Sequence, residues 1–336
     1  MVEHAGRAHV TSDAVGSDGS DNLDDQEWAA TRAWVEKQLP EGERVESAER
    51  LRGGWTSEMR RLHISGAGGR RQLVLRSFVK PFFLRAAEGL LAREAQVLTL
   101  LRTTDVPAAT LQAVDAAGEH CDHPSLLMSM LPGGIRLEQD QVGARAELLA
   151  RHLVKIHRVR ITEHTRPRSY QAWTSPERVR LPDAPGRPEL WGRAVDAIRR
   201  DPPDYEGCFL HRDFHPGNVL FSGHGEDLRV SGVVDWVETS WGPADLDVAH
   251  CSTALALLHG PDIGMRFADL YVAAGGRLSG ERADHLYWRL LDALAFAPDA
   301  EKVAGPWNEL GRTDLTARTL TGRLEDYLEA LFRRYG

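Results

Sequence analysis

Apolar positions in the first 80 residues change from helical spacing to short runs divided by glycines. From residue 26 to residue 39 the apolar side chains recur at the spacing of one helix face, which predicts a helix. Residues 44–80 then form three short runs rich in strand-forming residues. The first turn between them contains Gly53 and Gly54, and the second contains the glycines of 66–69. Such glycine-bearing breaks between short runs indicate antiparallel strands joined by turns.

A helix and a further strand complete this part of the chain. Residues 85–102 carry a long stretch of helix-forming residues and predict a helix. Residues 124–131 (PSLLMSML) are a short apolar run closed by a proline and two glycines, as expected for a buried strand. The region from about 44 to 131 is therefore predicted to be an antiparallel sheet accompanied by one helix.

Helical patterns dominate after residue 134. Residues 146–159 show apolar positions at helical spacing, and a loop rich in proline and arginine follows at about 165–190. Short apolar runs lie on both sides of the segment 211–218, and LRVSGVVDW gives a further predicted strand. Four more helices are predicted towards the end of the chain, at 245–258, 265–274, 284–297 and 320–335.

These elements predict an α+β fold with two lobes, because 336 residues are long for one core. Residues 1–24 are rich in serine, glycine and aspartate, and we expect them to be a disordered acidic tail. Residues 25–130 are predicted to form the β-rich N-lobe. Residues 131–336 are predicted to form the mostly helical C-lobe.

Charge and composition exclude several classes of protein. The formal net charge is −8, but residues 1–27 hold seven acidic side chains and one basic one, so the rest is nearly neutral. A nearly neutral body does not indicate a nucleic-acid partner, which would favour a basic face. We find no apolar stretch long enough to span a membrane and no signal-like N-terminus. The three cysteines have no CxxC spacing and indicate reduced thiols of a cytoplasmic protein.

Three oxygen-bearing side chains around residues 211–236 suit metal-assisted phosphoryl transfer. Asp213 is followed five residues later by Asn218, and Asp235 ends an apolar run. A carboxylate such as Asp213 can orient an attacking hydroxyl and accept its proton. The amide oxygen of Asn218 and the carboxylate of Asp235 are hard ligands of the kind that Mg²⁺ prefers when it bridges nucleotide phosphates.

The motifs HRDFHPGNVLF at 211–221 and GVVDW at 232–236 resemble the signature of the aminoglycoside phosphotransferase family. The family pattern is close to HGDLHPGNVL followed by GVIDW, and GPADLDVAH at 242–250 is similar to its GPxxxDLA segment. The resemblance covers roughly residues 45–260. It implies a protein-kinase-like bilobal fold, in which an antiparallel sheet with one main helix precedes a mostly helical lobe. It also implies Asp213 as the catalytic residue and Asn218 and Asp235 as metal ligands.

The same resemblance assigns nucleotide-binding residues in the first lobe. Gly53, Gly54 and Ser57 stand where the family has its phosphate-covering turn, and glycine there lets backbone N–H groups approach phosphate closely. The third strand offers Arg76 where protein kinases have lysine, and Glu94 is its expected helix partner. A guanidinium can still bind phosphate. A solvated Arg76 and Glu94 with no such role is the alternative.

The expected cofactors and partners follow from these assignments. Residues 128–131 align with the hinge whose backbone binds the purine, so Met128 and Met130 are expected to line the nucleotide site. The resemblance implies Mg²⁺, ATP or GTP as the phosphoryl donor, and a small hydroxyl-bearing substrate. Neither nucleic acid nor a membrane is expected as a partner.

The histidines beside Asp213 leave a different kind of site open. His211, Asp213 and His215 alternate along the chain and could hold zinc in a hydrolase. Both histidines are more readily interpreted as orienting the catalytic loop, because the resembled pattern has them without zinc. Arg212 stands where that pattern usually has glycine, and its role is open. Asp247 aligns with an aspartate that supports the catalytic region of the family.

The leading functional prediction is a kinase for an antibiotic hydroxyl, with aminoglycosides first and macrolides second. Kinases of choline-, homoserine- or sugar-type metabolites and a catalytically silent nucleotide-binding protein remain alternatives. A protein kinase is disfavoured because GPADLDVAH follows Asp235 too soon to leave a segment that could seat a peptide. Acids near the end of the chain could face a polyamine, but bases are interleaved with them, which favours solvated helices. These acids are Asp292, Asp299, Glu301, Glu325 and Asp326.

Overall fold

The computed structural model describes residues 28–51, 57–182, 185–297 and 300–336. The predicted tail 1–24 and the predicted phosphate-turn residues Gly53 and Gly54 lie outside these residues. The chain divides into two compact units. One runs up to Ala95 and includes Thr110–Met130, and the other contains Gln96–Ala109 and Leu131–Gly336.

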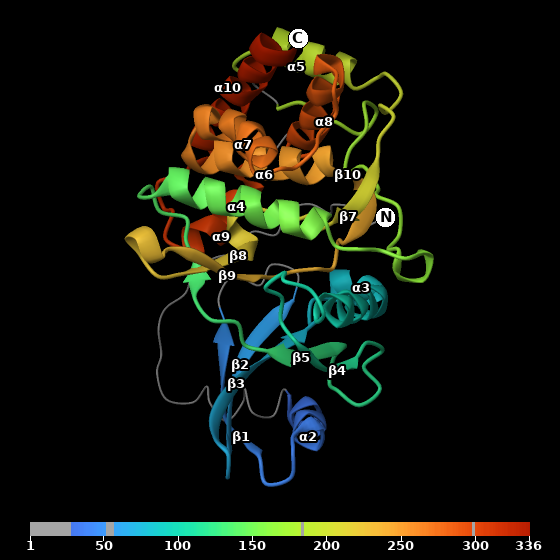
Figure 1. Ribbon diagram of the computed structural model, residues 1–336, viewed down its shortest axis with the longest axis vertical. Helices are drawn as coiled ribbons and strands as arrows, with labels where there is room; N and C mark the ends of the chain where they lie inside the picture. The colour runs from blue at the N-terminus through green and yellow to red at the C-terminus, as the bar shows by residue number, and fades with distance from the viewer. Residues whose placement is uncertain (1–27, 52–56, 183–184, 298–299) are drawn as a thin grey trace. The chain divides into compact units, whose positions relative to one another are not determined.

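The first unit is built on a five-stranded antiparallel sheet (Figure 1). Its strand order is β1-β2-β3-β5-β4, and all four pairings are antiparallel. The four strands predicted from the pattern are present, and β4 was not predicted. The bounds are β1 Arg44–Leu51, β2 Glu58–Gly66, β3 Gly69–Ser77, β4 Leu111–Asp115 and β5 Ser125–Ser129.

The core of the first unit explains why these segments form strands. On β2, Leu62 and Ile64 are buried two residues apart, as a half-buried strand requires. Helix α2 (Ala29–Gln38) lies beside β1 (Figure 1). Its Trp34 and Val35 pack into the same apolar cluster, together with Trp28 just before the helix. Helix α3 (Pro81–Leu101) begins four residues earlier than predicted, at a proline, which the first turn of a helix tolerates.

The second unit is mostly helical. All the helices predicted in it from apolar periodicity are present, while α5 and α9 were not predicted. The bounds are α4 Val142–His157, α5 Pro188–Ala197, α6 Ala244–His259, α7 Pro261–Ala273, α8 Arg282–Leu294, α9 Ala304–Glu309 and α10 Ala317–Tyr335. Short 3₁₀ turns η1 to η4 lie at Glu163–Thr165, Pro216–Asn218, Gly225–Asp227 and Ala300–Val303.

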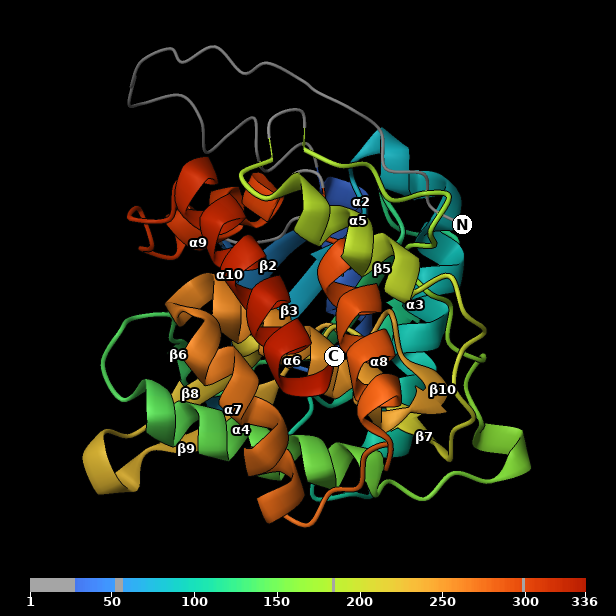
Figure 2. The same ribbon diagram turned by 90° about the horizontal axis from the view of Figure 1, so that it is seen from above.

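Helix α6 lies at the centre of this unit. It contacts α7, α8 and α10, which lie beside it in both views (Figures 1 and 2). Every residue from Asp245 to Leu258 is buried, so the helix has no solvent-facing side. A helix that is buried all round needs a partner for each polar group it carries. The partners of Asp247 and His250 lie in the candidate site.

Two small antiparallel sheets of the second unit frame the segment that carries the chemical motif. One pairs β7 with β10, and the other has the order β6-β8-β9. The bounds are β6 Gly134–Ile135, β7 Gly207–Leu210, β8 Val219–Ser222, β9 Arg229–Val233 and β10 Ser240–Pro243. No helix in the described part of the chain is both long and apolar enough to cross a membrane.

Candidate active site

The loop between β7 and β8, residues 211–218, is held by the buried side chain of Asp247 on α6. The Asp247 carboxylate accepts hydrogen bonds from the backbone N–H groups of His211 and Arg212, both at 2.8 Å. It also bonds to Nε2 of His157 on α4 at 3.1 Å. Burial alone would raise the pKa of Asp247, but the hydrogen bond and charge of His157 and the charge of Arg212 lower it. The predicted supporting role of Asp247 is confirmed.

Two residues of the candidate site have left-handed backbone conformations that side chains usually avoid. Arg212 has φ 74° and Asp235 has φ 66°. Among the described residues, Gln141 is the other non-glycine residue in this region of φ. Such conformations cost roughly 1–3 kcal/mol and persist where the surroundings enforce them. Glycine, usual in the resembled pattern at position 212, would adopt this φ without strain.

Arg212 is held in place by its own side chain. The guanidinium lies over the Trp173 ring at 4.5 Å and donates from Nη2 to the carbonyl of Gln171 at 3.2 Å. Arg212 is 3% exposed, and within the described residues its Nη1 has no hydrogen-bond partner. These contacts fix the backbone that leads into Asp213.

The structure brings Asp213, Asn218 and Asp235 together around one loop and one hairpin. Asn218 Nδ2 donates to both the backbone carbonyl and Oδ2 of Asp213, at 2.9 Å each. Strands β8 and β9 pair Val219 with Val233, and the Val234 N–H donates to the Asn218 carbonyl at 3.0 Å. Asp235, the next residue, therefore lies beside Asn218. The roles given to these three residues stay predictions.

His211 and His215 shape the loop through backbone hydrogen bonds. His211 Nε2 donates to the Val234 carbonyl at 3.0 Å, and its Nδ1 accepts from the Asp213 N–H at 3.2 Å. His215 Nδ1 accepts from the Gly217 N–H at 3.0 Å. Both ring nitrogens of His211 are thus engaged, so it has no lone pair to offer a zinc ion. The proposed zinc set of His211, Asp213 and His215 does not fit this geometry.

A third histidine, His250 on α6, reaches Asp213 and was not predicted from the sequence. Its Nε2 lies 3.1 Å from Asp213 Oδ1, and its Nδ1 lies 3.0 Å from Asp292 Oδ1 on α8. Potential ligand atoms of Asp213, His215 and His250 lie within 4.8 Å of one another. Both nitrogens of His250 face carboxylates, however, so neither is free for a metal. One feature of the sequence could have pointed to His250. It follows Asp247 by three residues, so on a helix the two side chains lie on the same face.

The interpretation of the late acids as solvated is wrong for two of them. Asp292 is 4% exposed and also accepts a hydrogen bond from the Thr253 hydroxyl at 2.7 Å. Glu325 on α10 is 6% exposed and accepts from Trp191 Nε1 at 2.9 Å. Arg289, one of the interleaved bases, is itself 2% exposed and donates to the Ser252 hydroxyl at 3.1 Å, so interleaved charges along the sequence do not show that α8 is solvated.

In the first unit, Arg76 and Glu94 form the predicted pair. Arg76 Nη1 donates to both carboxylate oxygens of Glu94, at 3.2 and 3.0 Å, and the side chains are 4% and 2% exposed. Arg76 Nε also donates to the Ser57 hydroxyl at 2.9 Å. A buried pair excludes the alternative of a solvated Arg76 and Glu94. Their part in nucleotide binding stays a prediction.

The expected hinge residues lie at the end of β5. Met128 is in this strand, opposite Val74 of β3, and its side chain is buried. Met130 follows the strand and is the last residue of the first unit. The predicted contact of this segment with a purine stays a prediction.

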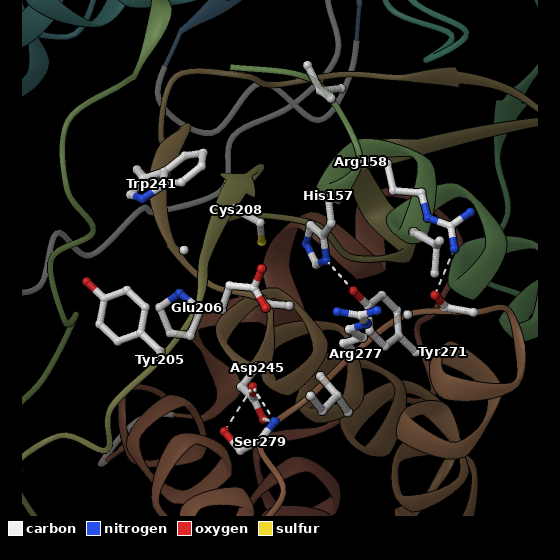
Figure 3. A pocket seen from close by; sticks show the side chains of 18 of the residues that line it. His157, Arg158, Tyr205, Glu206, Cys208, Trp241, Asp245, Tyr271, Arg277 and Ser279 are labelled. Atoms are coloured by element: carbon white, nitrogen blue, oxygen red, sulfur yellow. Dashed lines mark hydrogen bonds between the residues drawn. The ribbon is translucent and has the colours of Figure 1, made fainter. Parts of the chain in front are cut away.

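A cavity of about 450 Å³ in the second unit is lined by residues of α4, α6, α7, β7 and β10 (Figure 3). Its wall includes His157 and Tyr271, which are hydrogen bonded to each other at 2.7 Å (Figure 3). Asp213, Asn218 and Asp235 do not line it. The cavity therefore touches the anchor of the loop through His157, and it is separate from the groups that carry the predicted chemistry.

Comparison with known proteins decides the family. The model of the phosphotransferase enzyme family matches residues 47–290, which is most of the chain and includes all the motifs described above. The chain belongs to the phosphotransferase enzyme family. The family resemblance and the general activity, transfer of phosphate to a hydroxyl group, are thereby confirmed. No curated protein sequence matches this phosphotransferase.

Solved structures confirm the protein-kinase-like α+β fold of this phosphotransferase. A putative aminoglycoside phosphotransferase from Ralstonia eutropha is 18% identical, with 91% of this chain and 98% of that chain covered and a TM-score of 0.56. The macrolide 2'-phosphotransferase type I is 17% identical, with coverages of 92% and 97% and a TM-score of 0.56. A thermostable mutant of aminoglycoside phosphotransferase APH(4)-Ia, solved with ADP and hygromycin B, is 16% identical, with coverages of 90% and 98% and a TM-score of 0.57. Similarity at this level of identity establishes the fold.

Proposed function

We propose that this phosphotransferase moves the γ-phosphoryl group of ATP or GTP to a hydroxyl of a small antibiotic, with aminoglycosides the first candidates and macrolides the second. The observation that carries the proposal is the fixed carboxylate of Asp213, held by Asn218 within a loop that α6 anchors. Structures of the same fold include aminoglycoside and macrolide phosphotransferases. One of them was solved with ADP and hygromycin B, which supports a nucleotide donor and an antibiotic acceptor here.

Asp213 would act on the acceptor hydroxyl. The acceptor oxygen forms a bond to the γ-phosphorus, and the bond from that phosphorus to the β–γ bridging oxygen breaks. The leaving nucleoside diphosphate takes the electron pair, and the hydroxyl proton passes to the Asp213 carboxylate. The Asp213 side chain is 31% exposed, so a substrate hydroxyl can reach it. Its pKa, which burial alone would raise, is lowered by His215 and His250, so the carboxylate is ionised at neutral pH.

The donor set in the second unit fits a magnesium ion. Asn218 uses its Nδ2 on Asp213, which leaves the amide oxygen as the group it can offer to a cation. Asp235 contributes a carboxylate beside it, and both are the oxygen ligands that Mg²⁺ selects. When bound, the ion would neutralise charge on the nucleotide phosphates. Arg76, fixed by Glu94 and Ser57, would bind phosphate through its guanidinium.

Two variants of the purified protein test these roles. Asp213→Asn keeps the shape of the side chain but removes its basicity, so kcat should fall by about 10²–10⁴-fold while nucleotide affinity is largely kept. Asp235→Ala should instead weaken binding of the magnesium–nucleotide complex. Release of the nucleoside diphosphate measures kcat, and calorimetric titration measures nucleotide affinity. Equal losses of nucleotide binding in the two variants would contradict the assignment.

The acceptor is tested by expressing the chain in a sensitive bacterium and measuring growth inhibition by panels of aminoglycosides and macrolides. Resistance that disappears in Asp213→Asn supports the proposed substrate class. Absence of resistance to any of them would move the proposal to the hydroxyl-bearing metabolites. Nucleotide binding with no transfer to either class would indicate the catalytically silent alternative.

A further inference from the structure

A continuous chain of side chains leads from α8 through α6 to the proposed catalytic carboxylate, all within the second unit. Asp292 Oδ1 lies 3.0 Å from His250 Nδ1, and His250 Nε2 lies 3.1 Å from Asp213 Oδ1. The Thr253 hydroxyl donates to the other oxygen of Asp292 at 2.7 Å. His250 and Asp292 are almost completely buried. The contacts join residues that are 37 and 42 positions apart in the sequence.

The geometry favours a doubly protonated imidazole. Each ring nitrogen of His250 faces a carboxylate oxygen, and an ionised carboxylate accepts hydrogen bonds but cannot donate one. With both carboxylates ionised, both ring nitrogens carry protons. Burial alone would lower the pKa of His250, but the charge of Asp292 and the hydrogen bonds of Asp213 and Asp292 raise it to about 9. His215 also faces Asp213, with Nε2 at 3.7 Å from Oδ1, but burial lowers its pKa to about 4. At neutral pH, His250 therefore supplies the positive charge beside Asp213.

The imidazole ring has little freedom to turn. Trp173 meets it edge to face with ring centroids 4.8 Å apart, and Phe296 stacks on it at 5.9 Å. Asp213 is consequently bonded at Oδ1 by His250 and at Oδ2 by Asn218 Nδ2. Each carboxylate oxygen can accept a second hydrogen bond, so an acceptor hydroxyl still finds a free position on Asp213.

We propose that His250 and Asp292 form a positioning pair, in which an imidazolium held by Asp292 fixes the orientation of Asp213 for phosphoryl transfer. The inference rests on the proposed function of Asp213 and adds to it a pair of residues that does not touch the substrate. With Oδ1 held by His250 and Oδ2 held by Asn218, the Asp213 carboxylate keeps one orientation towards the acceptor hydroxyl.

The charge state of His250 can be measured without any activity. Long-range ¹H–¹⁵N NMR of the histidine rings in the nucleotide-free protein at pH 7.5 should show both nitrogens of His250 protonated. In Asp292→Asn, which keeps the side-chain shape and removes the charge, the ring should become neutral. A neutral His250 in the wild-type protein would overturn the proposal, whatever the protein's activity.

The positioning role is measured by turnover with a hydroxyl acceptor, or with water as acceptor in nucleotide hydrolysis. His250→Asn and Asp292→Asn should each lower kcat by about 10–100-fold, the scale of a misplaced reacting group, with KM for the nucleotide changed by less than about threefold. His259→Asn, on the same helix but bonded to Gln139, is the matched control and should keep its kcat. Unchanged kcat in both test variants would overturn the proposal. If the wild-type protein shows no turnover but His250 is doubly protonated, the proposed function is rejected. The protonated ring would still support the pairing of His250 with Asp292.

Discussion

Replacing Arg76 by methionine separates the structural contribution of the buried ion pair from its proposed contribution to phosphate binding. Arg76 and Glu94 make two hydrogen bonds, at 3.0 and 3.2 Å, with side chains 4% and 2% exposed. Removing one member of a buried ion pair costs about 3–5 kcal/mol. Replacing both residues by apolar side chains of similar size is often neutral for stability. We therefore expect Arg76→Met to unfold at much lower urea concentration, and Arg76→Met/Glu94→Met to recover most of the lost free energy.

The double variant then tests the function. If Arg76 binds phosphate by charge-assisted hydrogen bonds worth about 1.5–3 kcal/mol, the double variant should bind nucleotide roughly 10–100-fold more weakly despite its restored stability. Arg70 on the same strand pairs with Glu46 at 2.9 Å but is 79% exposed, so Arg70→Met should change the free energy of unfolding by less than about 1 kcal/mol. Urea denaturation and calorimetric nucleotide titration measure the two quantities. Wild-type nucleotide affinity in the stable double variant would refute a phosphate-binding Arg76.

Three further predictions concern the second unit. The free energy of unfolding of the nucleotide-free protein should fall by about 3 kcal/mol as the pH rises from about 6.5 to 9, since the folded state keeps the proton of His250 that the unfolded state loses near 6.5. Urea titrations at successive pH values measure this fall. His250→Asn should remove most of it and leave the smaller fall near pH 9 that comes from buried thiols with raised pKa values, such as Cys208 and Cys251. A flat wild-type profile would contradict the assigned charge. Asp247→Asn should destabilise the protein by about 2–4 kcal/mol, because the new amide N–H₂ would face backbone N–H groups that now donate to the carboxylate. Thermal or urea unfolding measures this loss, and wild-type stability of the variant would disprove the anchoring role of Asp247. Gly133→Ala should lower the free energy of unfolding by about 2 kcal/mol or more, since Gly133 has φ 91° and a Cβ there would meet the Phe221 carbonyl. A Cβ at Gly134 would enter open space, so the control Gly134→Ala should shift the urea midpoint little. Equal shifts in the two variants would be evidence against this strain.

Much of the fold could be predicted because its elements have strong local patterns. The long helices α8 and α10 repeat apolar residues at helical spacing over three or more turns. Strand β4, with the sequence LQAVD, is short and half exposed, so its alternation is too brief to distinguish it from a loop. Helix α5 begins at Pro188 within a segment whose prolines and arginines indicated a loop, and tertiary packing of Leu190 and Trp191 outweighs that composition.

Some residues of the site could be grouped from local sequence patterns, and others come together only through tertiary contacts. Asp213, Asn218 and Asp235 could be grouped from the sequence because a loop and one hairpin place them together. His250 and Asp292 could not, since their contacts join elements that meet only when α6 and α8 pack. The charge pattern of α8 was misleading, because an acid between basic neighbours is interpreted as solvated unless its helix face is known.

The contacts made by helix α6 explain how the strained backbone of the loop 211–218 persists. Asp247, His250 and Thr253 recur every three residues and therefore lie along one side of this buried helix. Asp247 holds the loop backbone next to the left-handed Arg212, His250 bonds Asp213, and Thr253 bonds Asp292 behind His250. Burying three polar side chains on a core helix is unfavourable unless each is hydrogen bonded, and here each bond also fixes a group of the proposed active site. The same contacts that satisfy the core thus enforce the strained loop, so the core of the second unit and the orientation of Asp213 are expected to change together.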